Sequence, residues 1–333
     1  MRTHIILALA LTLAATPVAL AQAPDAKAEL AAAINILQKY HLNRDKVDWP
    51  SLSDKAGSLI LDPQNASGAY GPIRYVIAQL GITHTQLMTA NQVKAINTGR
   101  PVGAARPPRV TPPQGYLLEG GIGLIEEKFL TGRNAEERQY EMAARHAIDR
   151  FNAKGICRFI LDLRGNSGGN MYPMIAGVSA LLGKGPYGYF NVDQQETAWV
   201  WPRNMGDIED RVAAQPAWLT QAPVAVLLDG FTASSGEFTA MAFKGRRNTR
   251  FFGEDTAGLL SANRAFPLPD GASLIVSTGW GSDRNHVPYT TVISPDEATP
   301  RGQETLDAAI AWLMARKCPV RSSHREPVSG GMR

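Results

Sequence analysis

The chain has 333 residues, of which 44% are hydrophobic and 19% charged, which is ordinary for a globular protein with one large domain or two modest ones. Its formal net charge of +4 is small, and no basic stripe with interleaved aromatic residues is present, so no nucleic-acid partner is expected. No His, Cys or carboxylate cluster has the spacing of metal ligands, and we expect neither a metal nor an organic cofactor.

Residues 1–21 have the pattern of a secretory signal peptide. Arg2 supplies a positive charge, and Ile5–Leu20 is apolar but short for a membrane span. Ala19-Leu20-Ala21 is a small-x-small cleavage site, which predicts a mature chain beginning at Gln22; an uncleaved anchor is the weaker alternative. We therefore expect a periplasmic or secreted protein with no stable membrane span after cleavage.

Residues 22–97 are predicted to form a small helical subdomain. Apolar residues recur at helical spacing in Asp25–Leu42, and further helices are expected over Leu52–Leu61 and Pro72–Leu80. Residues 98–114 are rich in Pro, Gly and Arg, which predicts a linker.

From residue 115 to 318, strand patterns alternate with helix patterns, which predicts an α/β core: a mixed, partly parallel sheet flanked by helices. The expected strands are Gly115–Leu118, Gly121–Glu126, Cys157–Leu163, Thr197–Trp201, Val224–Leu228, Arg250–Phe252, Ala265–Leu268, Ser273–Thr278 and Tyr289–Ile293. The expected helices are Ala135–Ala153, Met171–Leu182, Ser235–Phe243 and Glu304–Arg316. Residues 319–333 are expected to be a disordered tail, and no room is left for an inserted domain between linker and core.

The two cysteines, Cys157 and Cys318, permit one disulfide in an oxidising compartment. A bridge would join the last helix to the sheet, but the sequence does not show whether the two Cα atoms come within bonding range. Both outcomes remain open, and neither cysteine has the surroundings of a nucleophile.

Residues 229–237, Asp-Gly-Phe-Thr-Ala-Ser-Ser-Gly-Glu, place serines between a buried strand and a helix. At such a turn, the free N–H groups of the first helical turn can stabilise an oxyanion formed by attack of the Ser234 hydroxyl. Ser234 and Glu237 also have the spacing of a helix capping box, and for the motif alone this structural explanation is the stronger one.

Two other segments carry chemistry-bearing residues. The strand Phe159–Leu163 breaks into a glycine-rich turn containing Gly168 and Gly169, where the backbone can approach a ligand closely; a tight structural turn is the alternative. His84 follows a predicted helix, and histidine is a suitable base for a serine nucleophile. The chain has six histidines, so spacing alone does not select His84.

Taken together, these motifs resemble the tail-specific, or carboxyl-terminal-processing, serine peptidases of family S41. The matching segments occur in family order and are 47–49 (VDW), 80–85 (LGITHT), 161–169 (LDLRGNSGG), 232–237 (TASSGE), 253–258 (GEDTAG), 268–271 (LPDG) and 293–296 (ISPD). The motifs look most like the nisin-resistance-type branch, which lacks the usual PDZ domain.

The resemblance implies Ser234 as nucleophile, with Ser235 as the fallback. It also implies an oxyanion hole formed by the amide of Ser235 with that of Gly168 or Gly169. Many members use a lysine base at the position of Leu259, and residues 245–316 contain no lysine; the histidine-using branches instead map their base onto His84.

The third catalytic residue of tricorn-like members is a glutamate, and its place here, about Tyr289–Thr291, holds no carboxylate. We therefore expect a Ser–His dyad, with Glu237 as a possible support. The favoured function is an exported endopeptidase that acts on a peptide or protein C-terminus through an acyl-enzyme. The alternatives are a catalytically weak or inactive peptide-binding protein of the same fold and, less favoured, a serine esterase or acyl transferase.

Overall fold

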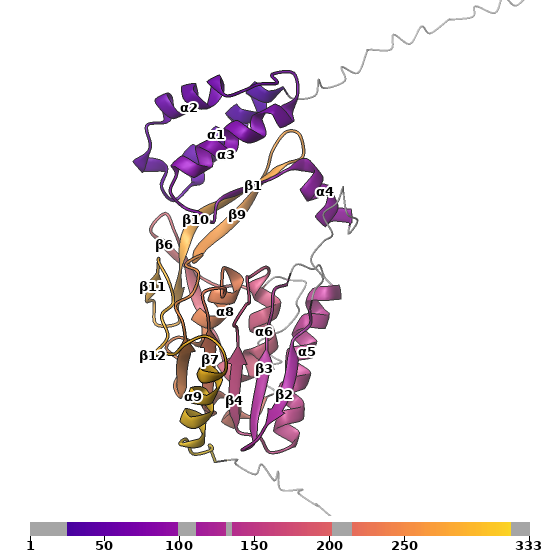
Figure 1. Ribbon diagram of the computed structural model, residues 1–333, viewed down its shortest axis with the longest axis vertical. Helices are drawn as coiled ribbons and strands as arrows, with labels where there is room; N and C mark the ends of the chain where they lie inside the picture. Colours follow the sequence, from indigo (N-terminus) through magenta and orange to yellow (C-terminus); the bar gives the residue numbers. More distant parts are fainter. Residues whose placement is uncertain (1–24, 99–110, 131–134, 202–214, 321–333) are drawn as a thin grey trace, which may run out of the picture.

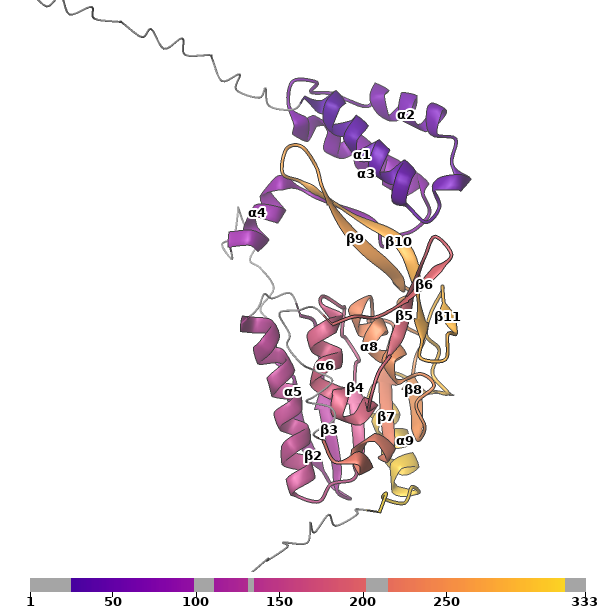
Figure 2. The same ribbon diagram turned by 180° about the vertical axis from the view of Figure 1, so that it is seen from behind.

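The computed structural model describes residues 25–98, 111–130, 135–201 and 215–320. The expected signal peptide, most of the expected linker and most of the expected tail lie outside these ranges. A helical bundle occupies one end of the molecule and an α/β core the other, and a β-hairpin lies between them (Figures 1 and 2). None of the helices in the described ranges has the length and apolar character needed to cross a membrane.

The core sheet has six strands in the order β12-β8-β7-β4-β3-β2. All neighbouring strands are parallel except β2 and β3, which form an antiparallel pair at one edge. The strands are β2 (Gln114–Leu118), β3 (Ile122–Glu126), β4 (Arg158–Asp162), β7 (Val224–Leu228), β8 (Thr249–Gly253) and β12 (Glu297–Ala298).

Helices cover both faces of the core sheet, because alternate side chains of its central strands point to opposite faces. On one face, Phe159, Leu161 and Val226 pack against α5 (Ala135–Ala153), α6 (Met171–Leu182) and α8 (Ser235–Phe243). On the other face, Ile160 and Leu227 pack against α9 (Gln303–Met314). This two-sided burial explains the continuous apolar runs that predicted the central strands.

A second, antiparallel sheet, the hairpin sheet, has its long strand β10 paired with β1, β5, β9 and β11. Its strands are β1 (Gln86–Met88), β5 (Gly188–Val192), β6 (Gln195–Ala198), β9 (Ser261–Pro267), β10 (Ser273–Asp283) and β11 (Pro288–Tyr289). The β9–β10 hairpin extends from the core towards the bundle (Figure 1). The chain therefore uses two sheets, and residues 261–277 connect the two parts of the molecule.

The bundle consists of α1 (Ala26–Tyr40), α2 (Trp49–Ser58) and α3 (Tyr70–Gln79), with short 3-10 turns at Arg44–Lys46 and Ala66–Ala69. Its core includes Leu37, Ile73 and Val76, and it continues onto Leu274 and Val276 of the hairpin. The bundle thus completes its hydrophobic core with residues that lie about two hundred or more positions away in the sequence.

The differences between expected and observed elements are local. The strand expected at Thr197–Trp201 lies at Gln195–Ala198, and the one expected at Tyr289–Ile293 is reduced to Pro288–Tyr289. Strands β1, β5 and β12, the helix α4 (Ala90–Thr98) and the 3-10 turn Ala217–Gln221 were not anticipated. Asp193 and Gln194 have positive φ angles, of 49° and 64° respectively. The turn of the β5–β6 hairpin therefore lacks the glycine that usually marks such a turn in a sequence.

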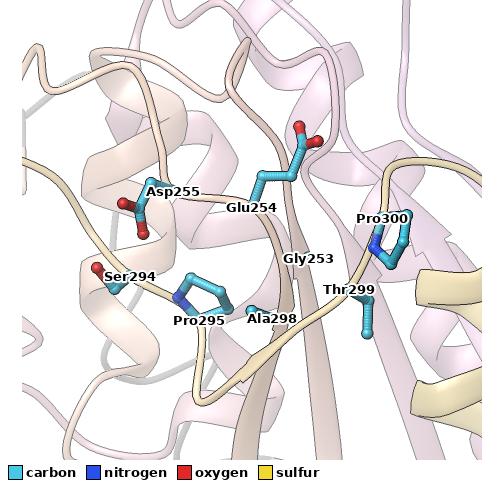
Figure 3. Close-up of a pocket in the computed structure, with 8 residues that line it drawn as sticks. All are labelled: Gly253, Glu254, Asp255, Ser294, Pro295, Ala298, Thr299 and Pro300. Carbon is cyan, nitrogen blue, oxygen red and sulfur yellow. The ribbon is translucent and has the colours of Figure 1, made fainter.

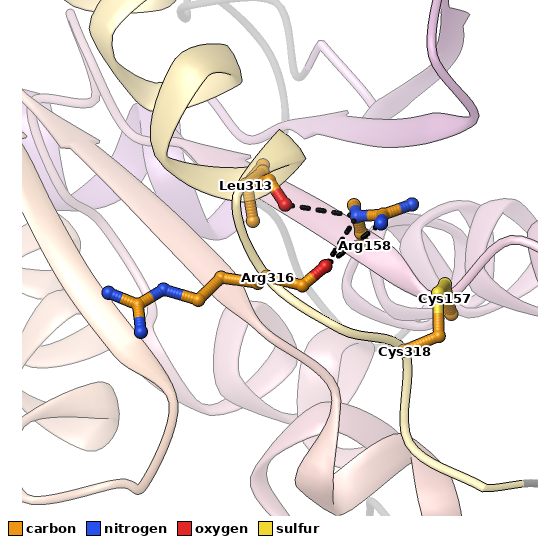
Figure 4. Close-up of a disulfide and its surroundings, with 5 residues drawn as sticks. All are labelled: Cys157, Arg158, Leu313, Arg316 and Cys318. Carbon is orange, nitrogen blue, oxygen red and sulfur yellow. Dashed lines mark hydrogen bonds between the residues drawn. A yellow bond between two sulfur atoms is a disulfide. The ribbon is translucent and has the colours of Figure 1, made fainter.

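Cys157 and Cys318 form a disulfide with their Cα atoms 5.6 Å apart. Arg158 lies next to it and donates to the carbonyl oxygens of Leu313, at 2.9 Å, and Arg316, at 2.8 Å (Figure 4). The end of α9 is therefore joined to the start of β4 both covalently and by hydrogen bonds.

Candidate active site

Ser234 lies at the turn between β7 and α8, where it is the N-cap residue of the helix. Its backbone angles, φ 52° and ψ −119°, are unusual for a residue with a side chain and store local strain. The Ala233 N–H donates to the Asn166 carbonyl at 2.9 Å, which holds this turn against the glycine-rich loop after β4. The turn thus fixes Ser234 between the end of β7 and the first turn of α8.

Glu237 is fully buried beneath this turn and accepts four hydrogen bonds. The donors are the backbone N–H groups of Ser234 (2.7 Å), Gly258 (2.9 Å) and Leu259 (2.8 Å) and the hydroxyl of Thr256 (2.6 Å). Burial raises the pKa of the Glu237 carboxyl, and the four hydrogen bonds oppose that shift. Glu237 therefore fixes the serine backbone in the manner of a capping box and has no hydrogen bond to His84.

His84 lies between the end of α3 and the start of β1. The chain leaves the helix through Gly81, whose φ of 68° favours glycine. Thr85 follows the histidine, and its hydroxyl accepts a hydrogen bond from the Ser277 N–H at 3.1 Å. The histidine is thereby held in the turn before β1, next to the hairpin sheet.

The fold brings His84 and Ser234, 150 residues apart, into contact, with the ring Nε2 3.0 Å from the serine Oγ. Burial lowers the pKa of His84 to about 4, and the contact with Ser261 opposes that shift. The imidazole is therefore neutral at neutral pH, as a general base must be. Leu259, at the family's lysine position, contributes only its backbone N–H, to Glu237.

Ser261 is a site residue that the sequence analysis missed. Its Oγ lies 2.8 Å from His84 Nδ1, the position that a carboxylate occupies in a catalytic triad. Ser277 and Asn263 lie beside it on the hairpin sheet. No sequence motif marks these residues, because their proximity depends on the pairing of β9 with β10.

The glycine-rich loop passes directly beside the nucleophile. A Cβ atom added to Gly168 would lie 2.8 Å from the Ser234 Cβ and 3.1 Å from the Ser235 nitrogen, so only glycine permits this approach. The Gly168 N–H itself donates to the Asn166 side chain at 3.0 Å, which leaves the amides of Gly169 and Ser235 as the candidate oxyanion donors. The Ser235 hydroxyl donates to the Gly169 carbonyl at 2.7 Å and is turned away from His84.

A separate pocket of about 540 Å³ lies at the carboxyl end of β8 and contains none of the predicted site residues. Figure 3 shows Asp255 and Ser294 on one side of it and Thr299 and Pro300 on the other. Among the residues that the structure describes, no group of three His, Cys, Asp or Glu side chains is arranged to hold a metal ion.

Residues 129–298, about half of the chain, match peptidase family S41, and the chain belongs to this family. Its mixed α/β fold is shared with solved structures that include a C-terminal processing protease.

Among curated proteins, the nisin-resistance protein of Lactococcus lactis subsp. lactis is 32% identical over 204 residues, covering 60% of this chain and 62% of that protein. The chloroplastic carboxyl-terminal-processing peptidase 2 of Arabidopsis thaliana is also 32% identical, over 48% of this chain and 29% of its own length. The matched region thus spans less than two thirds of either relative.

Two solved structures share the fold over most of the chain. A lipoprotein from Streptococcus agalactiae superposes with a TM-score of 0.73 at 23% identity, covering 88% of this chain and 98% of its own. The photosystem II D1 C-terminal processing protease gives a TM-score of 0.58 at 15% identity, with 87% and 96% covered.

Proposed function

We propose that this protein is an exported serine endopeptidase in which Ser234 is the nucleophile and His84 the general base. The observation that carries the proposal is the 3.0 Å contact between His84 Nε2 and Ser234 Oγ, which is within the range for direct proton transfer. Membership of a peptidase family and the strained strand-to-helix turn beneath the serine support the same assignment.

In the proposed reaction, His84 Nε2 takes the Ser234 proton as Oγ attacks the scissile carbonyl carbon of a peptide. The carbonyl oxygen becomes an oxyanion, which the amides of Gly169 and Ser235 stabilise. The imidazolium then returns the proton to the leaving amine, the C–N bond breaks, and an acyl-enzyme remains. Water, deprotonated by the same imidazole, hydrolyses this ester and regenerates the serine.

The proposed substrate is the C-terminal part of a peptide or protein in the periplasm or outside the cell. The names of two curated relatives support this class, since one is a nisin-resistance protein and the other a carboxyl-terminal-processing peptidase. The substrate would lie between the bundle with its hairpin and the core, where the two candidate catalytic side chains meet.

Labelling with a fluorophosphonate probe tests the nucleophile. We expect the wild-type protein and the Ser235→Ala variant to be labelled and the Ser234→Ala and His84→Ala variants to lose labelling. Mass-spectrometric mapping of cleavage sites in a pool of peptides from envelope proteins, with the same variants, tests the reaction and its position along the substrate.

The alternatives predict different results. A catalytically inactive peptide-binding protein would react with neither the probe nor the peptide pool. This alternative is motivated by the hydrogen-bond partners of the His84 ring, which among the described residues include neither a carboxylate nor a lysine. Ester turnover without peptide cleavage would instead indicate an esterase or acyl transferase. Either outcome would refute the peptidase assignment.

A further inference from the structure

We infer that Ser261, Ser277 and Asn263 form a hydroxyl relay that fixes the protonation state of His84, in the place where many serine hydrolases use a carboxylate. The inference rests on the proposed function, because it assigns these residues as positioning residues for the proposed base. None of them contacts the nucleophile or would contact the reacting carbonyl.

The relay is defined by a closed set of contacts. Ser261 Oγ lies 2.8 Å from His84 Nδ1, 2.8 Å from Ser277 Oγ and 3.2 Å from Asn263 Oδ1. Ser277 Oγ lies 3.0 Å from the same Asn263 Oδ1. Ser261 and Ser277 are buried, so their hydroxyl groups depend on these partners rather than on solvent.

The direction of the hydrogen bonds follows from Asn263. Its Nδ2 faces the His84 carbonyl oxygen at 3.4 Å, and the reversed amide would place two acceptor oxygens against each other. Asn263 Oδ1 can only accept, so Ser277 donates to it. Ser261 then donates to Ser277 or to Asn263, and its lone pairs remain available to accept from His84 Nδ1–H.

The other tautomer of His84 satisfies fewer groups. With the proton on Nε2, the ring Nδ1 would have to accept the single hydroxyl proton of Ser261. The Ser277 hydroxyl could then donate to only one of its two neighbours, Ser261 Oγ or Asn263 Oδ1. One contact of the relay would then be lost, which costs the protein one buried hydrogen bond. The relay therefore favours Nδ1–H and leaves the Nε2 lone pair facing the Ser234 hydroxyl.

A relay of neutral groups orients the ring without adding a negative charge. Among the described residues, the hydrogen-bond partners of the ring are Ser234 and Ser261, and neither carries a charge. The imidazolium formed during catalysis is thus stabilised less than it would be by an aspartate, and the neutral base persists to lower pH.

The test measures the second-order rate constant of fluorophosphonate labelling between pH 4 and 9 for the full-length protein and its variants. Ser261→Ala should lower the plateau rate about 10- to 100-fold, a smaller loss than that caused by removing the carboxylate of a triad. Ser261→Thr retains the hydroxyl and should recover most of the rate. Ser277→Ala should have a smaller effect, because Ser261 can still donate to Asn263.

Asn263→Asp distinguishes a relay from a merely structural contact. A carboxylate at the end of the relay should stabilise the imidazolium and move the acidic limb of the pH profile upwards by at least half a pH unit. Ser273→Ala is the control, since this hydroxyl lies on β10, the strand that pairs with that of Asn263, and donates to the Phe266 carbonyl outside the relay. Urea unfolding verifies that each variant is folded.

The inference would be overturned if Ser261→Ala labelled within twofold of the wild type, or if Ser261→Thr lost as much rate as the alanine variant. An Asn263→Asp variant that remains folded with an unshifted acidic limb would overturn it as well. Labelling that persists in Ser234→Ala, or is absent from the wild type, would instead remove the proposed function itself, so the two failures are distinguishable.

Discussion

Replacing Glu237 with glutamine should destabilise the protein far more than the loss of one charge at a surface would. Oε2 accepts from the N–H groups of Ser234 and Leu259, whereas Oε1 accepts from the Gly258 N–H and the Thr256 hydroxyl. A glutamine has one oxygen, and its NH2 group must therefore face two of these donors.

The less costly orientation places the NH2 group towards Thr256 and Gly258. The Thr256 oxygen already accepts from the Ile293 N–H at 2.9 Å and has a second lone pair for the amide, but the Gly258 N–H and the Thr256 O–H both lose their acceptor. Each buried donor left unsatisfied costs about 1–3 kcal/mol, and weaker bonds to the neutral oxygen add about 1 kcal/mol. We therefore expect the free energy of unfolding to fall by about 3 kcal/mol or more.

Urea unfolding measures this loss, and Glu254→Gln serves as the control because Glu254 is a nearby exposed carboxylate. The Ser234 N–H retains its acceptor in the favoured orientation, so the folded fraction should still be labelled by a fluorophosphonate. A change in unfolding free energy below 0.5 kcal/mol, within the range of ordinary surface substitutions, would show that Glu237 does not hold the turn as the structure indicates.

Two further substitutions probe the site and the core. Gly169→Ala introduces a Cβ that collides with the Leu130 carbonyl, at a φ of 116°, and should reduce labelling about 100-fold or more, whereas Gly57→Ala, in open space on α2, should not. Burial raises the pKa of the Glu127 carboxyl well above its usual value. The folded protein therefore favours the protonated carboxyl, and its free energy of unfolding should fall as the pH rises. Glu127→Gln should flatten this decline in urea unfolding from pH 5 to 9, and Glu126→Gln should leave it unchanged.

Helices and strands with a strong local sequence pattern could be predicted from the sequence. The bounds of α5, α6 and α8 agree with those expected, because apolar spacing defines them, and β7 is a buried apolar run. Ser261 could not be predicted, since it lies 177 residues from His84 in the sequence and acts only after β9 pairs with β10. The two-sheet division was missed for the same reason, because strands of both sheets have similar local patterns.

The position of the proposed base relative to the nucleophile is set mainly by one strand, β10. At one end, Leu274 and Val276 pack into the bundle. Ser277 follows them; its N–H donates to the Thr85 hydroxyl, and its own hydroxyl belongs to the relay. At the other end, Gly281 packs so closely against Phe238 and Met241 of α8 that a Cβ there would lie within 2.6 Å of the phenylalanine ring. Because Ser234 is the N-cap residue of α8, the strand connects both candidate catalytic residues to one rigid element. A fold that holds the base beside a long strand packed against the nucleophile's own helix can therefore keep the 3.0 Å contact before substrate arrives, without requiring closure of the bundle.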